Sequence, residues 1–260
     1  MTDASGPGLR VEREDRVAWL ILDRPERRNA VDRAMRVLLH ETCADLEADP
    51  SVSVVVLTGS GDAFCAGTDL REPPPDEPAH PLADPPARIS APIELLTKPV
   101  IAAVNGPAAG GGLELALAAD LRVAADTATF SLPEVKIGSL SGSGGTQRLF
   151  AEVPSAVAWK MLLTGEAIDA AEAHRVGLVS DLVAAVELRA AVTRIAATIA
   201  ANAPLSLRAI KLAGRAATEG GLANGLALER MLWALLATTE DRAEGRAAFR
   251  ERRPPQFRGR

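Results

Sequence analysis

Short apolar runs alternate with helix-period segments in the first half of the chain. Residues 17–22 (VAWLIL) and 52–57 (VSVVVL) are rich in β-branched side chains and bounded by charged or turn residues, which is typical of buried strands. Between them, residues 30–49 repeat apolar positions near the helical period and end before Pro50. A strand, a helix and a strand in this order predict a right-handed crossover.

The same pattern recurs further along, and then it changes. Predicted strands at residues 99–104 (PVIAAV) and 121–125 (LRVAA) flank a predicted helix that follows three glycines. From residue 155 onward the apolar positions follow mostly the helical period. We therefore expect an α/β first half with a stack of strands and a helical second half. No fixed-period sequence repeat is found.

Composition narrows the functional classes. The chain has 260 residues and a formal net charge of -5, which gives no general attraction to nucleic acid or to anionic lipid. Its two cysteines, Cys43 and Cys65, are too few for a disulfide framework and lack zinc-ligand spacing, so no metal site is expected. No apolar run approaches the length of a membrane span. We expect a cytoplasmic protein with reduced thiols that binds neither membrane nor nucleic acid.

A proline-dense segment interrupts the pattern between residues 71 and 99. Because proline removes a backbone donor and fixes φ, most of this segment is not expected to hold regular structure. A loop of this length inside a compact chain is usually a lid, a binding loop or a disordered segment. It directly follows the stretch AFCAGTDL, so a lid is favoured over a linker.

The glycine triplet Gly110–Gly112 opens the predicted helix in the stretch NGPAAGGGLELALAAD. The first N–H groups of a helix have no partner within it, and the absence of a Cβ lets a ligand approach them. This arrangement suits an anion, or a carbonyl oxygen that is becoming one. Close packing of the helix against a strand is an equally good explanation of the glycines, and the two alternatives stay open here.

Common nucleotide and hydrolase motifs are absent. Neither GPAAGGG nor the later GSLSGSGGTQRL is followed by Lys and Ser/Thr, and neither has the GxGxxG spacing of a dinucleotide site. No serine in the second stretch has glycine on both sides at the spacing of a nucleophile elbow. The three histidines, His40, His80 and His174, are interpreted as surface residues rather than bases.

Two glutamates remain as candidate acid–base groups. Glu114 lies in the first turn after the glycines with apolar neighbours at helical spacing, and a buried carboxylate is costly unless it is used or paired. An exposed acid at a helix start would be unremarkable instead. Glu134 follows Pro133 and is also typical of a helix start. Two acids beside one amide-lined pocket would be acid and base partners, but the sequence alone does not bring them together.

Several stretches together resemble the enoyl-CoA hydratase/isomerase family, also called crotonases. The similarity runs from LDRPERRNAV at Leu22 to GRAAFRERR at Gly245, and its most specific parts are VVLTGSGDAFCAGTDL, KPVIAAVNGPAAGGGLELALAAD, FSLPEVKIGSLSGSGGTQRL and AHRVGLVSDLV. The resemblance implies an α/β fold, a crotonase-like spiral of ββα units, with a C-terminal helical trimerisation region. We expect a core domain at residues 1–195 and a helical region at 196–260.

The resemblance also implies an acyl-CoA site. Its oxyanion hole would use the backbone amides of Thr68 and Gly111, and its catalytic carboxylates would be Glu114 and Glu134. Arg242, Arg246 and Arg250 recur near the C-terminus and fit either phosphate binding or a solvated basic face. The full set of residues expected to contact substrate or CoA is Arg28, Ala30, Ala66, Thr68, Asp69, Leu70, Arg71, Gly111, Pro133, Gly142, Phe249 and Arg252.

The implied activity is the hydration of a 2-enoyl-CoA thioester by a lyase of fatty acid metabolism, acting as a homotrimer or a dimer of trimers. No cofactor is expected, because coenzyme A is part of the substrate. A Δ3,Δ2-enoyl-CoA isomerase is the alternative within enzymes, and a non-catalytic trimeric scaffold or RNA-binding relative is the alternative outside them. Two departures from the family pattern bear on substrate choice: Thr68 replaces the commoner alanine, and residues 72–92 are unusually rich in proline.

Overall fold

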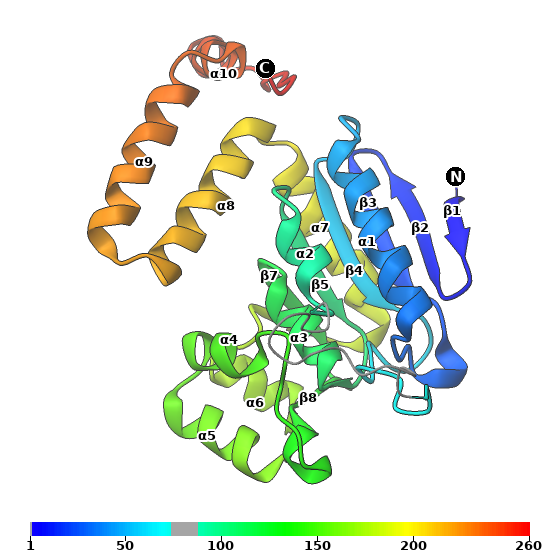
Figure 1. Ribbon diagram of the computed structural model, residues 1–260. Helices are drawn as coiled ribbons and strands as arrows, with labels where there is room; N and C mark the ends of the chain where they lie inside the picture. Colours follow the sequence, from blue (N-terminus) through cyan, green and yellow to red (C-terminus); the bar gives the residue numbers. More distant parts are fainter. Residues whose placement is uncertain (1, 74–87) are drawn as a thin grey trace.

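A twisted, mostly parallel sheet forms the centre of the protein (Figure 1). The computed structural model describes residues 2–73 and 88–260. In spatial order, the strands of this main sheet are β1 (Thr2–Gly6), β2 (Leu9–Glu14), β3 (Val17–Leu22), β4 (Val54–Gly59), β5 (Val100–Val104), β7 (Leu121–Ala125) and β10 (Asp181–Val183).

The strand pairing changes direction at β3. Strands β1 and β2 pair antiparallel, as do β2 and β3, whereas every pair from β3 to β10 is parallel. Val17 pairs with Val54 and Leu57 pairs with Ala102. The expected strand, helix and strand at residues 17–57 are therefore present as β3, α1 (Arg33–Ala48) and β4, with the two strands side by side in parallel.

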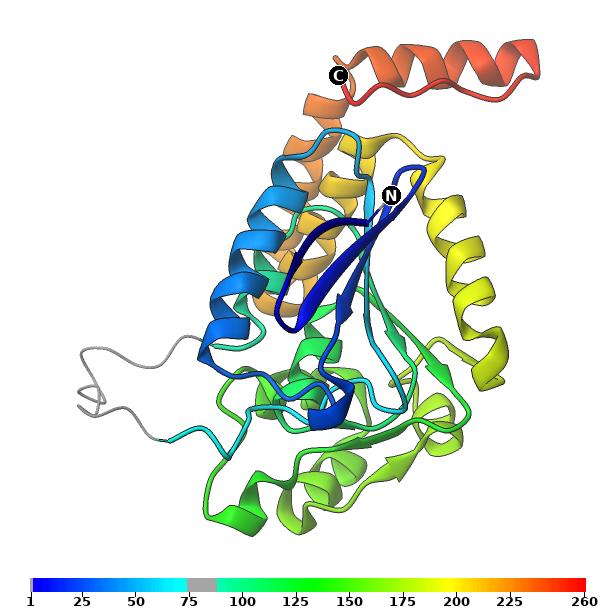
Figure 2. The same ribbon diagram turned by 90° about the vertical axis from the view of Figure 1, so that its right-hand side faces the viewer.

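Alternate side chains of β3 enter two different cores, which explains why the run VAWLIL is continuously apolar. Ala18, Leu20 and Leu22 face α1, α2 (Ala91–Leu95) and α3 (Gly111–Ala118), while Val17, Trp19 and Ile21 face α7 (Leu188–Ala200). Figure 2 shows α1 on one side of the sheet and α7 on the other. Strand β3 is thus buried on both faces.

A second, smaller layer turns the chain into a spiral. Strands β6 (Ala108–Ala109), β8 (Thr129–Ser131) and β9 (Ile168–Asp169) form a three-stranded sheet. Single parallel bridges extend this layer, from Cys65 to Ala108 and from Thr68 to Val31. Each turn therefore contributes a strand to the main sheet, a short extended segment to the second layer and usually a helix. This is the expected spiral of ββα units.

The remaining short elements lie beyond the second layer or link it to the helices. They are the 3₁₀ turns η1 (Pro25–Arg27), η2 (Pro133–Ile137) and η3 (Ala185–Glu187), and the helices α4 (Gly145–Glu152), α5 (Ser155–Thr164) and α6 (Ala170–Arg175).

Helices α8 (Pro204–Glu219), α9 (Leu222–Leu236) and α10 (Glu240–Glu251) extend away from the sheet (Figure 1). Lys211 anchors α8, because its buried ammonium lies 2.8 Å from an Asp120 carboxylate oxygen and donates to the Lys98 carbonyl. The expected domain boundary near residue 195 falls inside α7, so the division into a core and a C-terminal region stays a prediction.

Part of the proline-dense segment forms a helix. Its central residues, 74–87, lie outside the described part of the chain, so the predicted lid lies there too. At its end, Pro92 sits in the first turn of α2, where a missing N–H costs no helical hydrogen bond. Across residues 2–73 and 88–260, no single helix is long and apolar enough to cross a membrane.

Candidate active site

The three glycines at the start of α3 have three different environments. Gly110 has φ +54°, a conformation that side-chain-bearing residues rarely adopt. A Cβ on Gly112 would overlap the carbonyl group of Cys65. A Cβ on Gly111 would lie 3.1 Å from the Ile89 side chain and 3.4 Å from the Cα of Gly67. Close packing therefore explains Gly112, whereas Gly111 lies beside Gly67 and the Ile89 side chain.

Two backbone amides lie in segments that touch each other. Gly67 has φ +90°, and a Cβ on it would lie 2.8 Å from the nitrogen of Gly111. The Val31 N–H donates to the Gly67 carbonyl, and the Val31 carbonyl accepts from the Asp69 amide, so the N–H of Thr68 faces away from that bridge. Among the described residues, neither the Thr68 amide nor the Gly111 amide has a hydrogen-bond acceptor. Both donors are available to a ligand.

Glu114 is buried, with 3% of its surface exposed. Its Oε1 accepts hydrogen bonds from the amides of Ser143, at 2.6 Å, and Gly145, at 2.9 Å. Gly145 is the first residue of α4, so the carboxylate meets the positive end of that helix. The solvated-acid explanation of Glu114 is therefore excluded, and the carboxylate has fixed donors in place of water.

Glu134 lies in the first turn of η2, beside the same glycines. A Cβ on Gly110 would lie 3.1 Å from Glu134 Oε1. The pKa of Glu134 is raised above its ordinary value, first because the carboxyl group is partly buried and also because Glu114 places a negative charge nearby; the Ser141 hydroxyl opposes this shift. Neither Glu134 Oε2 nor Ser141 Oγ has a partner of normal hydrogen-bond geometry among the described residues. The two glutamates are thus near enough to interact electrostatically.

The Thr68 hydroxyl is directed toward α1. Its Oγ1 accepts a hydrogen bond of 2.8 Å from the Arg36 guanidinium. The substitution of threonine for the family's commoner alanine therefore leaves the Thr68 N–H in place and brings an arginine to the same loop.

The chain is similar to known proteins over nearly its whole length. The family model described as enoyl-CoA hydratase/isomerase matches residues 12–260. An (E)-benzylidenesuccinyl-CoA hydratase from Thauera aromatica is 47% identical over 96% of this chain and 98% of its own length. A 2,3-dehydroadipyl-CoA hydratase from Escherichia coli K12 is 44% identical, over 97% and 99% respectively.

This chain belongs to the enoyl-CoA hydratase/isomerase family. The crystal structure of an enoyl-CoA hydratase from Mycobacterium tuberculosis H37Rv is similar to it, with a TM-score of 0.89, 37% identity, and coverage of 98% of this chain and all of that one. The expected crotonase fold is therefore confirmed. The relatives are named hydratases, which are lyases, and the expectation of an enzyme of this type is confirmed with it.

Most of the residues expected to bind CoA lie on the loops near the Thr68 and Gly111 amides. The Arg28 carbonyl accepts from the Ala66 amide at 2.9 Å, which joins the turn after η1 to the Thr68 loop. Ala30 is buried behind that turn, and Pro133 opens η2 beside Glu134. Exposed positions on the same loops are Ala66, Leu70, Arg71 and Gly142.

The Asp69 side chain is bound to neighbouring residues of the protein. Its carboxylate accepts from the Arg71 amide at 3.1 Å and lies 3.4 Å from the Arg24 guanidinium. These contacts shape the loop, whereas a contact with CoA stays a prediction.

Phe249 and Arg252 lie at the end of α10, and α10 is far from α3 in the fold (Figure 1). Phe249 is 86% exposed. Within one chain these two residues do not join the site, so their expected role in binding CoA needs a second copy and stays a prediction. Of the three arginines on α10, Arg242 stacks over Trp233 at 5.5 Å, whereas Arg246 and Arg250 are exposed.

Several residues of the site were not expected from the sequence. Ser143, Gly145 and Ile89 contact Glu114 or Gly111, and they come from the GSLSGSGG stretch and the end of the proline-dense segment. The glycine pair at the start of α4, Gly144 and Gly145, is a sequence signal of free amides, but nothing in the sequence shows that Glu114 accepts from this segment.

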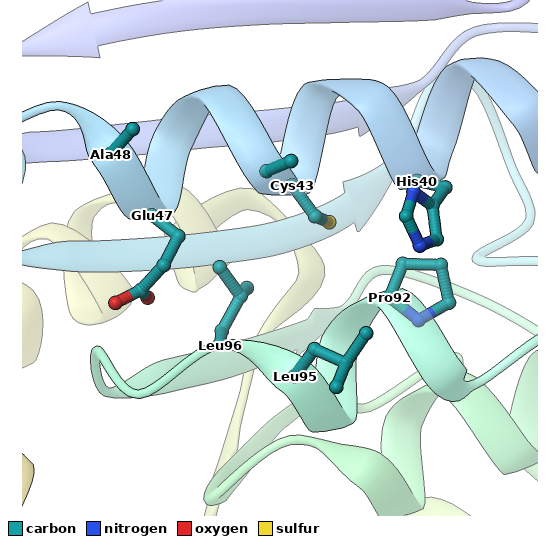
Figure 3. Close-up of a pocket in the computed structure, with 8 residues that line it drawn as sticks. His40, Cys43, Glu47, Ala48, Pro92, Leu95 and Leu96 are labelled. Atoms are coloured by element: carbon teal, nitrogen blue, oxygen red, sulfur yellow. The ribbon is translucent and has the colours of Figure 1, made fainter.

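An apolar cavity of about 300 Å³ lies elsewhere, between α1 and α2 (Figure 3). His40, Cys43 and Glu47 face Pro92, Leu95 and Leu96 across it. Burial raises the pKa of the Cys43 thiol to about 12, so this thiol is not a nucleophile.

His40 and His174 are exposed on α1 and α6, as expected; His80 lies outside the described residues. Among the described residues, no group of His, Cys, Asp and Glu could hold a metal ion.

Proposed function

We propose that this protein adds water across the 2,3 double bond of a 2-enoyl-CoA thioester to give a 3-hydroxyacyl-CoA. The observation that carries the proposal is the grouping of two interacting glutamates beside two unpaired backbone amides. The names of the relatives support a hydratase-type reaction.

The amides of Thr68 and Gly111 would bind the thioester oxygen. When water attacks the β-carbon, negative charge moves onto this oxygen as an enolate forms. Fixed donors stabilise that charge more in the transition state than in the substrate. One such donor is typically worth about 3 to 4 kcal/mol.

The two glutamates would handle the water and its protons. Glu114, with Oε1 held by two amides, orients the water and takes its proton as the oxygen attacks the β-carbon. Glu134 supplies the proton that the α-carbon receives, and partial burial together with the nearby charge of Glu114 raises its pKa and so favours the protonated form. Because the two carboxyl groups lie near one water, they can share the roles of acid and base.

The reaction adds one water and transfers no electrons, so it needs no redox cofactor, and coenzyme A enters as part of the substrate. We further propose a homotrimer or a dimer of trimers built through the C-terminal helices. Support comes from large apolar side chains exposed on α9, namely Leu222, Leu226, Met231, Trp233 and Leu235.

A product assay tests the proposed reaction. Crotonyl-CoA should gain the mass of one water, as measured by mass spectrometry of the product. A 3-enoyl-CoA should not change mass; bond migration without hydration of either substrate would support the isomerase instead. No reaction with any enoyl-CoA would favour a non-catalytic scaffold. Both relatives are named for acyl groups with a second carboxyl group, so the substrate panel should include dicarboxylic enoyl-CoAs.

A further inference from the structure

Ser143 uses its backbone and its side chain to join separate parts of the site. Its N–H donates to Glu114 Oε1 at 2.6 Å, and its Oγ accepts from the Ile89 amide at 3.0 Å. Its carbonyl oxygen lies 2.6 Å from Ser90 Oγ and accepts from Arg148 at 3.1 Å. Ser143 is 8% exposed and Ser90 is fully buried, so these bonds do not compete with bulk water.

The Glu94 carboxylate contacts both groups that bind the Ser143 carbonyl, namely Ser90 and Arg148. The Glu94 carboxylate lies 2.5 Å from Ser90 Oγ, 2.9 Å from Arg148 and 2.7 Å from Arg88. Burial raises the pKa of Glu94, but the Ser90 hydrogen bond and the Arg148 charge outweigh that effect, so its pKa lies below the ordinary value. Glu94 is therefore ionised at neutral pH and holds Ser90 and Arg148 in place.

Ile89 connects the same segment to the amide of Gly111. Two carbons of its side chain lie 3.1 and 3.2 Å from the position of a Cβ on Gly111, and Ile89 is 4% exposed. A group bound at the Gly111 amide therefore lies next to Ile89. The backbone of Ile89 is in turn bonded to the Ser143 side chain, and the backbone of Ser143 is bonded to Glu114.

We infer that Ser143 and Ser90 are positioning residues that couple the wall beside the thioester, formed by Ile89, to the carboxylate of Glu114. An acyl group that displaces Ile89 moves Ser143, and Glu114 loses its alignment with the water. Acyl groups are thereby discriminated mainly in kcat rather than in KM. This inference rests on the proposed hydratase function.

The first experiment removes each hydroxyl. Ser143→Ala leaves the buried Ile89 amide without its acceptor. Ser90→Ala removes a hydroxyl whose single proton is shared between the Ser143 carbonyl and the Glu94 carboxylate. For crotonyl-CoA, each variant should lower kcat by about tenfold, since a buried group loses its partner, while KM stays within about twofold because CoA contacts are unchanged. Ser139→Ala, in an exposed part of the same loop, is the matched control and should keep the wild-type kcat.

The second experiment measures the coupling itself. Ile89→Val should change the ratio of kcat values for crotonyl-CoA and a bulkier enoyl-CoA in the wild-type background. In the Ser143→Ala background the same substitution should change that ratio by less than about half as much, because contacting residues act non-additively. Equal effects in both backgrounds would overturn the inference.

Wild-type turnover separates the two proposals. If the wild-type protein hydrates no enoyl-CoA, the proposed function fails. If it does, and both serine variants keep kcat within about twofold of wild type, the inference alone fails. Thermal unfolding and the Kd for a saturated acyl-CoA are measured for each variant. A loss of kcat that is matched by a loss of acyl-CoA binding would show general damage to the site and would also count against the inference.

Discussion

Glu134 Oε1 occupies the space that a side chain on Gly110 would need, since a Cβ there would lie 3.1 Å from this oxygen. The backbone of Gly110, at φ +54° and ψ −125°, also lies in a region that is essentially restricted to glycine. The absence of a side chain at Gly110 therefore serves both the turn into α3 and the position of a candidate catalytic carboxylate.

Gly110→Ala should lower activity and stability together. The new Cβ strains the backbone and displaces Glu134, so we expect kcat to fall by at least about tenfold and the free energy of unfolding to fall by about 1–3 kcal/mol. Gly214→Ala on α8 is the control, because a Cβ there has open space and alanine favours a helix by about 1 kcal/mol. Steady-state kinetics and urea unfolding check both; a fully active Gly110→Ala would contradict the placement of Glu134.

Glu114→Gln and Glu134→Gln should each lower turnover by more than about tenfold while acyl-CoA binding largely survives. Glutamine keeps the size of the side chain but takes up no proton at the pH of the reaction. Glu166→Gln, which changes an exposed carboxylate, should have no effect. Unchanged turnover in both active-site variants would remove the two-carboxylate mechanism.

The Thr68 loop gives a test that separates backbone from side chain. Thr68→Ala keeps the amide donor and loses only the hydroxyl bonded to Arg36, so kcat should stay within about fivefold of wild type. Gly67→Ala places a Cβ 2.8 Å from the Gly111 nitrogen in a backbone with φ +90°, so kcat should fall by about a hundredfold or more. The reverse order of effects would show that the hydroxyl, not the amide, carries the function.

Glu134 should also leave a signature in the pH dependence of stability. Its pKa is raised in the folded protein above the ordinary value of 4.5, so the folded state binds the proton more tightly than the unfolded chain. The free energy of unfolding therefore falls as pH rises from 4.5 through the raised pKa. Glu134→Gln lacks this titration, and its stability relative to wild type should increase across that window and then level off.

Urea unfolding of wild type and Glu134→Gln between about pH 4 and pH 8 measures this difference. A difference that does not change with pH would mean that Glu134 has the same pKa in the folded and unfolded states.

The elements predicted from the sequence are those that bury both faces or one long face. Strand β3 could be predicted because its side chains enter two cores and are therefore continuously apolar. Helix α1 could be predicted because one face of it packs on the core and carries its apolar residues. The predicted strand at residues 52–57 begins two residues early, because pairing with β3 starts at Val54. Strand β2 was missed: charged residues fill its less buried positions, so the alternation in LRVERE was weak.

The shortest strands could not be predicted. Strands β6 and β9 have two residues each, and β8 and β10 have three, so their pairing depends on neighbours that the fold supplies. The residues of the candidate site also divide into those that the local sequence indicates and those that only the tertiary fold brings together. Glu114 stood out as a single carboxylate in an apolar helix, whereas its bond to Ser143 joins residues 29 positions apart and depends on the tertiary fold.

The chemical parts of the candidate site are spread over three turns of the spiral: the Thr68 amide follows β4, Gly111 and Glu114 follow β6, and Glu134 follows β8. The hydrogen-bonded strands of the main sheet do not contain any of them. Evolution can therefore exchange one part, such as the proton donor after β8, without altering the register of the sheet or the other turns. A fold of this construction can acquire new reactions one loop at a time.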